Sequence, residues 1–339
     1  MNKPWNRMVT PWLKLGIATS GLLGFSFGAL AADVDAKALR TQALELIGPI
    51  PAKMPGADKD TPALVQLGKE LYFETALSKN NSQSCNTCHR VDENRGGVDN
   101  DPTSKGAFGE RGGRNSPTTL NAGFQFAQFW DGRADDLKAQ AKGPVLNPVE
   151  MAMPEEAEVV KRLNALPKYQ GMFKAAFPGE DAPVTYDNMA HALAAFERTL
   201  VTQDRFDDFL KGDDKALTST ELKGLHQFLT QGCTTCHYGP VLGGQVYQKV
   251  GLVNPFPSDD KGRSVVSKDE DDDFKFKVPM LRNIAITQPY FHKGQIATLE
   301  DAVRKMGWHQ LGKNLTDEEV QSLVAFLKTL TDKPRAKGT

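Results

Sequence analysis

The sequence predicts a mainly α-helical protein made of two tandem, similar domains with long loops. Apolar residues recur at helical spacing in several segments, and no segment shows the clear alternation of a half-exposed strand. Motifs of the first half also return in the second half at constant spacing. The chain has 339 residues, which is enough for two domains that each bury a core.

Each half is predicted to contain a helix shortly before a pair of cysteines. Residues 64–73 have the apolar spacing of a helix. In the second half, Thr218 is predicted to cap the N-terminus of a helix that continues to Leu229. Each of these helices is followed shortly by a pair of cysteines.

Two further segments repeat between the halves. Residues 117–137 align without a gap on residues 279–299, and the shared Pro, Asn, Phe, Gly and Leu keep one offset of 162 residues. The helical run 193–200 likewise resembles residues 323–330. We interpret these matches as the duplication of one domain. The alternative is that two unrelated segments share turn residues by chance.

The duplication and the polar stretch at residues 203–216 suggest where the parts of the chain begin and end. We expect a signal peptide at 1–31, an N-terminal lead segment at 32–60, a first domain at 61–204, a second domain at 205–331 and a C-terminal tail at 332–339.

The N-terminus has the layout of an export signal. Three basic residues lead into the mostly apolar run 15–30, which closes with Ala29-Leu30-Ala31. The run is short for a membrane span, although an uncleaved anchor is the alternative. Cleavage after Ala31 would remove three positive charges and no acids, so the formal net charge would change from −1 to −4. This charge balance gives no indication of a nucleic-acid partner, and we expect no stable membrane span after cleavage.

All four cysteines lie in two identical frames. These are Cys85-Asn-Thr-Cys88-His89 and Cys233-Thr-Thr-Cys236-His237. The Cys-x-x-Cys-His motif attaches c-type haem: both thiols form thioethers, and the histidine is placed under the iron. Two disulfides would leave both histidines unexplained, whereas a single frame could also be a redox dithiol or part of a zinc site. The sequence predicts two covalently attached haem c groups, each wrapped by a cytochrome c-like domain.

The remaining histidines are few. His191 and His226 lie in predicted helices, where packing or surface roles are more common. His292 lies in a tight turn and is the counterpart of Trp130 in the first half. An iron with both axial positions filled mainly carries electrons, whereas an iron with a free position can bind peroxide.

Methionine is a natural second ligand for a haem of high potential, because a thioether favours reduced iron. Met306, expected at the end of a helix that is followed by Gly307, is our candidate for the second haem. Met280 is the competitor, and Met151 and Met153 are weaker candidates. Core packing is the ordinary role of a lone methionine.

These residues resemble a known family, the bacterial dihaem cytochrome c peroxidases. The similarity extends over about residues 67–330. It includes both haem motifs and, in family order, residues 114–118, 128–133, 140–144, 149–151, 276–279 and 290–294. The resemblance implies a periplasmic enzyme that reduces hydrogen peroxide to water with electrons from a small c-type cytochrome or a cupredoxin. It also implies a homodimer.

The resemblance implies roles for residues of the first site. His89 would be the proximal ligand of the peroxide-reacting haem, with Gln140 and Glu150 in its distal pocket. A carboxylate near the iron can transfer a proton between the peroxide oxygens if desolvation raises its pKa. Gln140 could orient peroxide by donating a hydrogen bond. Local sequence alone favours a solvated surface acid in a Pro-bounded loop for Glu150, and the resemblance reverses this preference.

The resemblance also implies roles at the second site and at the domain junction. His237 and Met306 would ligate the electron-transfer haem, which favours Met306 over Met280. Trp130 would lie between the two haems, either as packing or as part of their coupling. The three residues that match the family's calcium site are Asn115 and, through their carbonyl oxygens, Thr287 and Pro289.

One departure from the family pattern concerns the first haem. Many members place a distal histidine, which must leave the iron on reduction, in the loop that corresponds to residues 103–112. Its expected position falls at or beside Ala107, and the chain has no histidine between His89 and His191. We hypothesise that the first haem has no sixth ligand from the protein and reacts with peroxide without prior half-reduction.

Two other functions predict different properties of the haem sites. A plain dihaem electron-transfer cytochrome would have both irons closed and no peroxide turnover. A related oxidase that modifies tryptophan in a partner protein typically has tyrosine at the position of Met306. The acidic run 269–273 is expected to be a solvated loop and not a metal or docking site.

Overall fold

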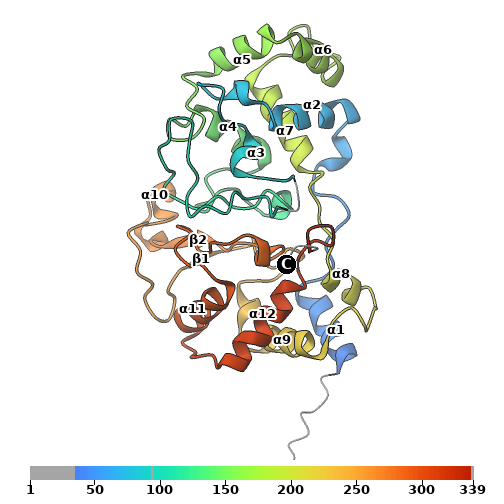
Figure 1. Cartoon of the computed structure of the whole chain (residues 1–339), viewed down its shortest axis with the longest axis vertical. Helices are drawn as coiled ribbons and strands as arrows, with labels where there is room; N and C mark the ends of the chain where they lie inside the picture. The colour runs from blue at the N-terminus through green and yellow to red at the C-terminus, as the bar shows by residue number, and fades with distance from the viewer. Residues whose placement is uncertain (1–34, 93–94, 337–339) are drawn as a thin grey trace, which may run out of the picture. The chain divides into compact units, whose positions relative to one another are not determined.

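The computed structural model describes residues 35–92 and 95–336, so the predicted signal peptide lies outside the described residues. The described part is mainly helical, as predicted (Figure 1). Its α-helices are α1 (Ala36–Leu46), α2 (Pro62–Tyr72), α3 (Cys85–Cys88), α4 (Leu137–Leu146), α5 (Glu156–Ala165), α6 (Pro167–Ala176), α7 (Tyr186–Glu197), α8 (Arg205–Leu210), α9 (Ser219–Thr230), α10 (Ser264–Ser267), α11 (Leu299–Leu311) and α12 (Asp317–Lys328). No helix within these residues is long and apolar enough to cross a bilayer.

The structure also contains two short strands that the sequence did not indicate. They are β1 (Tyr247–Lys249) and β2 (Lys275–Lys277), which pair antiparallel with Tyr247 opposite Lys277. Each strand has three residues, which is too short for an alternating pattern to be recognised.

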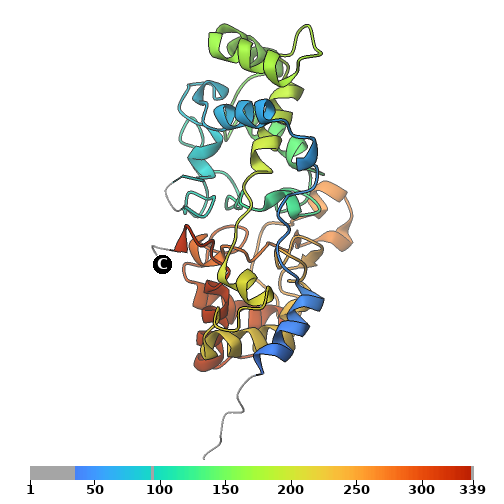
Figure 2. The same ribbon diagram turned by 90° about the vertical axis from the view of Figure 1, so that its right-hand side faces the viewer.

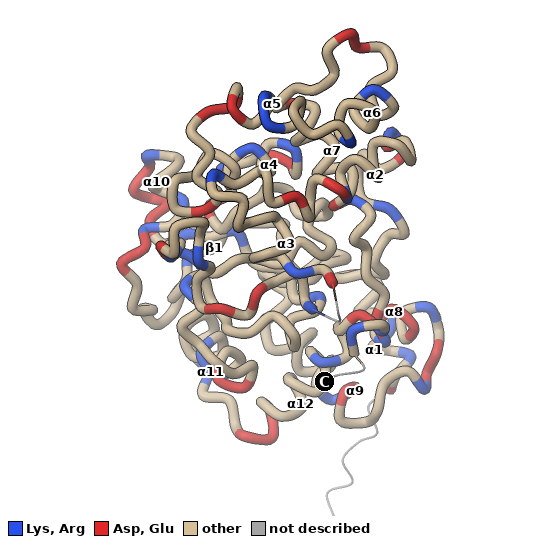
Figure 3. Tube along the Cα trace, turned by 45° about the horizontal axis from the view of Figure 1, so that its top comes forward, with Lys and Arg blue, Asp and Glu red and all other residues tan. Residues whose placement is uncertain are grey.

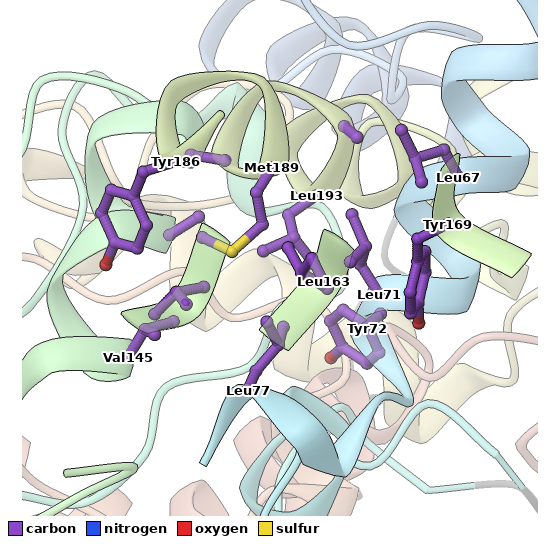
Figure 4. Close-up of a cluster of buried hydrophobic side chains, with 14 of the residues drawn as sticks. Leu67, Leu71, Tyr72, Leu77, Val145, Leu163, Tyr169, Tyr186, Met189 and Leu193 are labelled. Carbon is purple, nitrogen blue, oxygen red and sulfur yellow. The ribbon is translucent and has the colours of Figure 1, made fainter. Parts of the chain in front are cut away.

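Two large hydrophobic cores lie in different parts of the chain. The first is built by α2, α4, α5, α6 and α7, and Figure 4 shows Leu67 and Leu71 of α2 with Met189 and Leu193 of α7 in it. The second is built by α1, α8, α9, α11 and α12. We retain residues 61–204 and 205–331 as proposed domains, with α1 from the lead segment packing against the second.

Each core contains one pair of helices that approach very closely. α2 contacts α7, and α9 contacts α12 (Figures 1 and 2). A Cβ placed on Gly68 would lie 1.8 Å from the carbonyl oxygen of Ala192, and a Cβ placed on Gly224 would lie 1.9 Å from that of Ser322. The same helix crossing therefore occurs in both halves and requires glycine in both.

The segment that follows each haem-type motif also has the same backbone in both halves. Phe129 and Phe291 have φ values of 66° and 68°, and Gly132 and Gly294 have φ values of 66° and 61°. An isolated antiparallel bridge accompanies each turn, Gln128 with Ala134 and Tyr290 with Ile296. These paired features, all 162 residues apart, support the interpretation of a duplicated domain.

The end of α11 differs from the sequence expectation. The helix does not end at Met306 but continues to Leu311, and Gly312, with φ 66°, forms its C-cap. Gly307 is instead an interior glycine, because a Cβ there would lie 2.8 Å from Leu315 Cδ1. Met306 consequently lies within a continuous helix.

Buried and exposed charges have different roles in this fold. Buried Arg282 donates to Asp204 at 2.5 Å and to Asp207 at 3.0 Å, which ties α8 to the segment after β2.

The acidic run 269–273 lies near α10, where basic and acidic residues alternate (Figure 3). Its first three residues are exposed, and Asp272 and Asp273 form ion pairs with neighbouring basic residues. A solvated loop agrees with this arrangement.

Candidate functional site

A cavity in the second half is lined by all the residues expected to hold the second haem. Its walls include Cys233, Cys236 and His237 of the motif and Met306 of α11. Met280 lines the same cavity, although it is buried in a small apolar cluster. The residues that line this cavity therefore fit a covalently held haem. Both methionines line it, so both remain candidates for the second ligand of the iron.

The histidine of the second motif is prepared to act as a neutral ligand. The backbone N–H of His237 donates to the carbonyl oxygen of Cys233 at 3.0 Å. Its Nδ1 lies 3.1 Å from the carbonyl oxygen of Leu242. Because a carbonyl only accepts, Nδ1 carries the proton and Nε2 keeps its lone pair. Burial lowers the pKa of His237, which also favours the neutral ring.

The first motif has the same geometry. The backbone N–H of His89 donates to the carbonyl oxygen of Cys85 at 3.0 Å, and Nδ1 of His89 lies 2.9 Å from the carbonyl oxygen of Pro117. Burial lowers the pKa of His89 as well. Both motifs thus present a neutral imidazole whose Nε2 can bind a metal ion.

The cysteines do not have the properties of a reactive dithiol or a zinc site. No disulfide joins any of the four within the described residues. Burial raises the pKa of Cys88 and of Cys233 to about 11, whereas reactive cysteines have lowered pKa values. Within residues 35–92 and 95–336, no three His, Cys, Asp or Glu side chains form a group that could hold a metal ion. Thioether attachment of haem is the alternative that fits these thiols.

Glu150 lies beside the first motif in a mostly buried position. Asn147 Nδ2 donates to Glu150 Oε1 at 2.8 Å and orients the carboxyl group. Burial raises the pKa of Glu150, while the Asn147 hydrogen bond and the charge of Arg133 act in the opposite direction. The negative charge of Glu150 in turn contributes to the raised pKa of Cys88. The structure therefore brings Glu150 and the first motif together.

Gln140 is half-buried in α4, the helix that leads to the Glu150 segment. No hydrogen bond of its side chain occurs within the described ranges, so its amide group is available to a ligand. Gln140 lies ten residues before Glu150 in the sequence, and no hydrogen bond joins the two side chains in the structure.

The loop that lacks histidine packs directly against the Glu150 segment. The backbone N–H of Ala107 donates to the carbonyl oxygen of Glu150 at 2.7 Å. A Cβ on Gly106 would lie 2.2 Å from the carbonyl oxygen of Val149. A bridge between Lys105 and Arg111 closes the loop. Ala107 is consequently held next to Glu150.

Trp130 joins the first half to the second cavity. Its indole Nε1 donates to the carbonyl oxygen of Asn115 at 2.8 Å, and its side chain lines the second cavity. The Trp130 ring also has edge contacts with Phe276 and His292 at centroid distances of 6.5 and 6.4 Å. This position is consistent with a residue between two haems.

The three residues that match the family's calcium site lie on the wall of one cavity. Asn115, Thr287 and Pro289 all line the second cavity. Asn115 Nδ2 donates to the carbonyl oxygens of Asp101 and Pro102 at 3.0 and 3.3 Å, which leaves its side-chain oxygen as the atom available to a cation.

The sequence patterns did not single out two buried ionisable residues. Lys277 lines the second cavity and donates to Gln125 Oε1, and burial lowers its pKa to about 7. Glu197, the last residue of α7, is buried, and burial raises its pKa to about 8. Lys277 lies in the segment 276–279, and Glu197 is opposite Leu327 in the repeated helix, so a charged residue among apolar neighbours is the sequence signal at both positions.

Comparisons with known proteins agree with this site. A family model described as "Di-haem cytochrome c peroxidase" matches residues 62–215. "Cytochrome c551 peroxidase" of Pseudomonas aeruginosa is 48% identical over 94% of this chain and 93% of its own length, and the protein of the same name from Nitrosomonas europaea is 45% identical over 94% and 93%. A crystal structure of a MauG-like protein associated with microbial copper homeostasis has a TM-score of 0.75 and 29% identity, covering 85% of this chain and 96% of that one. By its similarity over almost its whole length, this chain belongs to the di-haem cytochrome c peroxidase family.

Proposed function

We propose that this protein is a periplasmic dihaem cytochrome c peroxidase that takes electrons from a small c-type cytochrome or a cupredoxin. The reaction consumes one hydrogen peroxide, two electrons and two protons and yields two water molecules. The observation that carries this proposal is the difference between the two haem-type sites. Met306 lines the second cavity, whereas a half-buried carboxyl group, Glu150, lies beside the first motif.

The residues that would hold the haems are the two motifs and one methionine. They are Cys85, Cys88 and His89 at the first site and Cys233, Cys236, His237 and Met306 at the second. When bound, each haem supplies an iron that exchanges one electron, and the first supplies the place where the O–O bond is cleaved.

Glu150 would perform the proton transfer that cleavage of the O–O bond requires. Its carboxylate accepts a proton from one oxygen of peroxide and returns it to the departing oxygen. Burial raises the pKa of Glu150, which makes its carboxylate a better proton acceptor than a solvated glutamate. Asn147 holds one carboxyl oxygen, and the Gln140 amide would donate a hydrogen bond that orients peroxide.

The Ala107 loop supports peroxide access without prior reduction. The side chain at position 107 is a methyl group that cannot ligate a metal ion. Its N–H is hydrogen-bonded to the Glu150 carbonyl oxygen, which anchors the loop to the segment that carries the proposed acid–base group. Peroxide would therefore meet no protein ligand that has to leave.

Calcium and dimerisation are further parts of the proposal. The side-chain oxygen of Asn115 and the carbonyl oxygens of Thr287 and Pro289 would bind one calcium ion, since oxygen atoms are its preferred ligands. Because Asn115 also accepts from Trp130 through its carbonyl, removal of calcium by a chelator should alter the surroundings of Trp130. Tryptophan fluorescence, measured before and after chelation, tests the calcium site. The sedimentation coefficient tests the proposed homodimer.

The direct test of the function is peroxide turnover with a reduced donor. The purified holoprotein is mixed with hydrogen peroxide and a reduced small c-type cytochrome, and donor oxidation is followed optically. We expect two donor molecules oxidised per peroxide. A holoprotein with two haems that leaves the donor reduced would instead be an electron-transfer cytochrome, and the proposal would be wrong.

A further inference from the structure

The duplication allows the surroundings of the two haem-type sites to be compared position by position. Three of the apolar residues that line the second cavity matter for this comparison: Phe228 of α9, Leu281 after β2 and Leu327 of α12. The glycine pair at the helix crossings, Gly68 and Gly224, aligns α2 with α9. The offset of 162 residues aligns the segments after the motifs, and the runs 193–200 and 323–330 align α7 with α12.

The matching positions of the first half are all polar. Tyr72 stands opposite Phe228, Thr119 opposite Leu281 and Glu197 opposite Leu327. All three first-half residues are buried. Three positions that line the second cavity with hydrocarbon are thus occupied in the first half by two hydroxyl groups and a carboxyl group.

Two of these polar groups are linked to the proximal histidine. The Tyr72 hydroxyl donates to the carbonyl oxygen of His89 at 2.6 Å and lies 3.2 Å from the Thr119 hydroxyl. Burial, followed by the nearby charge of Glu197, raises the pKa of Tyr72, so that Tyr72 stays protonated. This hydroxyl pair is therefore a fixed hydrogen-bonding group and not a titrating one.

Glu197 is the titrating member of the set. Its neighbours from the packed elements are Tyr72 of α2 and Cys85 of α3, and both of their pKa values are raised in part by its charge. The cation beside it is Arg198, which donates to both carboxyl oxygens of Asp60 at 2.6 and 2.7 Å. Because Asp60 already neutralises Arg198, burial dominates and raises the pKa of Glu197 to about 8.

We propose that Glu197 takes up one proton when the first haem accepts one electron. At alkaline pH, where Glu197 is ionised in the oxidised protein, the ferric haem, the Glu197 carboxylate, an electron from the second haem and a proton from solvent give the ferrous haem and a protonated Glu197. An added electron makes this low-dielectric site more negative, which raises the pKa of a nearby carboxyl group. Leu327 cannot do the same at the second haem. The inference rests on the proposed function only in that a haem must occupy the first site.

The test is the pH dependence of the reduction potential of each haem in the holoprotein, followed by optical spectra under controlled potential. Between the pKa values of Glu197 in the oxidised and reduced states, a tenfold fall in proton concentration should disfavour reduction of the first haem up to tenfold, or about 59 mV for one electron. Glu197→Gln should abolish this slope. The second haem, near which Lys277 titrates, should keep its own pH profile in the variant.

Two controls separate Glu197 from its neighbours. Glu150→Gln removes the other carboxyl group near the first motif and should retain the part of the slope that lies at alkaline pH, where Glu197 titrates. Tyr72→Phe introduces the type of side chain found in the second half and should shift the potential equally at every pH, because no titrating group is lost. A wild-type slope in Glu197→Gln would overturn the proposal.

Assembly and proton uptake provide independent checks. If Glu197→Gln does not incorporate two haems, Glu197→Leu offers the residue that the second half uses at this position. Reduction of the wild-type protein in unbuffered solution at alkaline pH, where Glu197 starts ionised, should take up protons at the first haem's potential, and no uptake there would also contradict the proposal. Peroxide turnover is assayed separately, so a protein that turns over without the slope would disprove this inference alone.

Discussion

Glu150 acquires its proposed role from its neighbours. Asn147 fixes one carboxyl oxygen, burial raises the pKa, and the Ala107 N–H anchors the backbone of the same residue. The Asn147 hydrogen bond and the charge of Arg133 lower the pKa of Glu150 and partly offset the effect of burial. A carboxyl group in such surroundings holds a proton more readily than a solvated glutamate does, which suits it to proton transfer.

Replacing Glu150 by glutamine tests this role. We expect Glu150→Gln to lower peroxidase turnover by at least about 10²-fold, as is typical when an acid–base group is lost. The optical spectra of both haems should stay nearly unchanged. In the wild type, kcat/KM should fall on the acid side at a pH above the usual Glu value of 4.5, because protonation removes the base, and this limb should vanish in the variant. Glu155→Gln, at an exposed position, is the control. Unchanged turnover in Glu150→Gln would remove this residue from the mechanism.

Position 107 can be used to close the first site deliberately. We expect Ala107→His to place an imidazole beside Glu150 that binds the first iron in the oxidised protein. Peroxide turnover should then require prior reduction, whereas the wild type should react in the fully oxidised form. Ala107→Leu, which has no ligating atom, is the control for loop distortion. Equal dependence on pre-reduction in wild type and Ala107→His would contradict the assignment of this loop.

Residues whose chemistry is carried by a motif could be predicted from the sequence. The two Cys-x-x-Cys-His frames specify their ligands by spacing, and Thr218 indeed caps α9 by accepting from Glu221 N–H. Residues whose role depends on packing could not be predicted. Glu197 resembles any charged residue at the end of a helix, and only its burial against α2 and α3 distinguishes it.

At the scale of elements, the helix crossings explain which glycines are required. Gly68 of α2 allows α7 to approach until the two backbones are in contact, and Gly224 of α9 allows the same for α12. Gly307 shows the limit of sequence reasoning, because a glycine after Met306 reads as a helix end. The helix continues through it to Leu311 and ends at Gly312, and a Cβ on Gly307 would lie 2.8 Å from Leu315 Cδ1, so close packing and not a helix end accounts for this glycine.

Alanine substitution at a helix crossing should be costly. We expect Gly68→Ala to destabilise the holoprotein by about 1–3 kcal/mol or more, since the new Cβ would overlap the Ala192 carbonyl oxygen. Gly171→Ala in α6 is the matched control, because its Cβ would meet nothing within 4 Å. That change should stabilise by roughly 0.5–1 kcal/mol through helix propensity. Thermal unfolding midpoints measure both effects, and equal midpoints for the two variants would refute the packing argument.

At the scale of the whole molecule, duplication followed by divergence explains how one fold serves two tasks. Both halves keep the haem motif, the helix crossing and the turn at Phe129 and Phe291. The second half surrounds its cavity with apolar residues and offers Met306, whereas the first half places Glu150 beside its motif and Glu197 in its buried helix packing. We propose that the second half delivers electrons and the first uses them for chemistry.

The central claim is that the first haem is open to peroxide in the resting enzyme. An electron spin-resonance spectrum of the fully oxidised holoprotein, recorded before and after addition of one equivalent of peroxide, tests it most directly. We expect one high-spin haem and one low-spin haem, with the high-spin signal lost on addition of peroxide. Two low-spin haems that do not respond to peroxide would contradict the account.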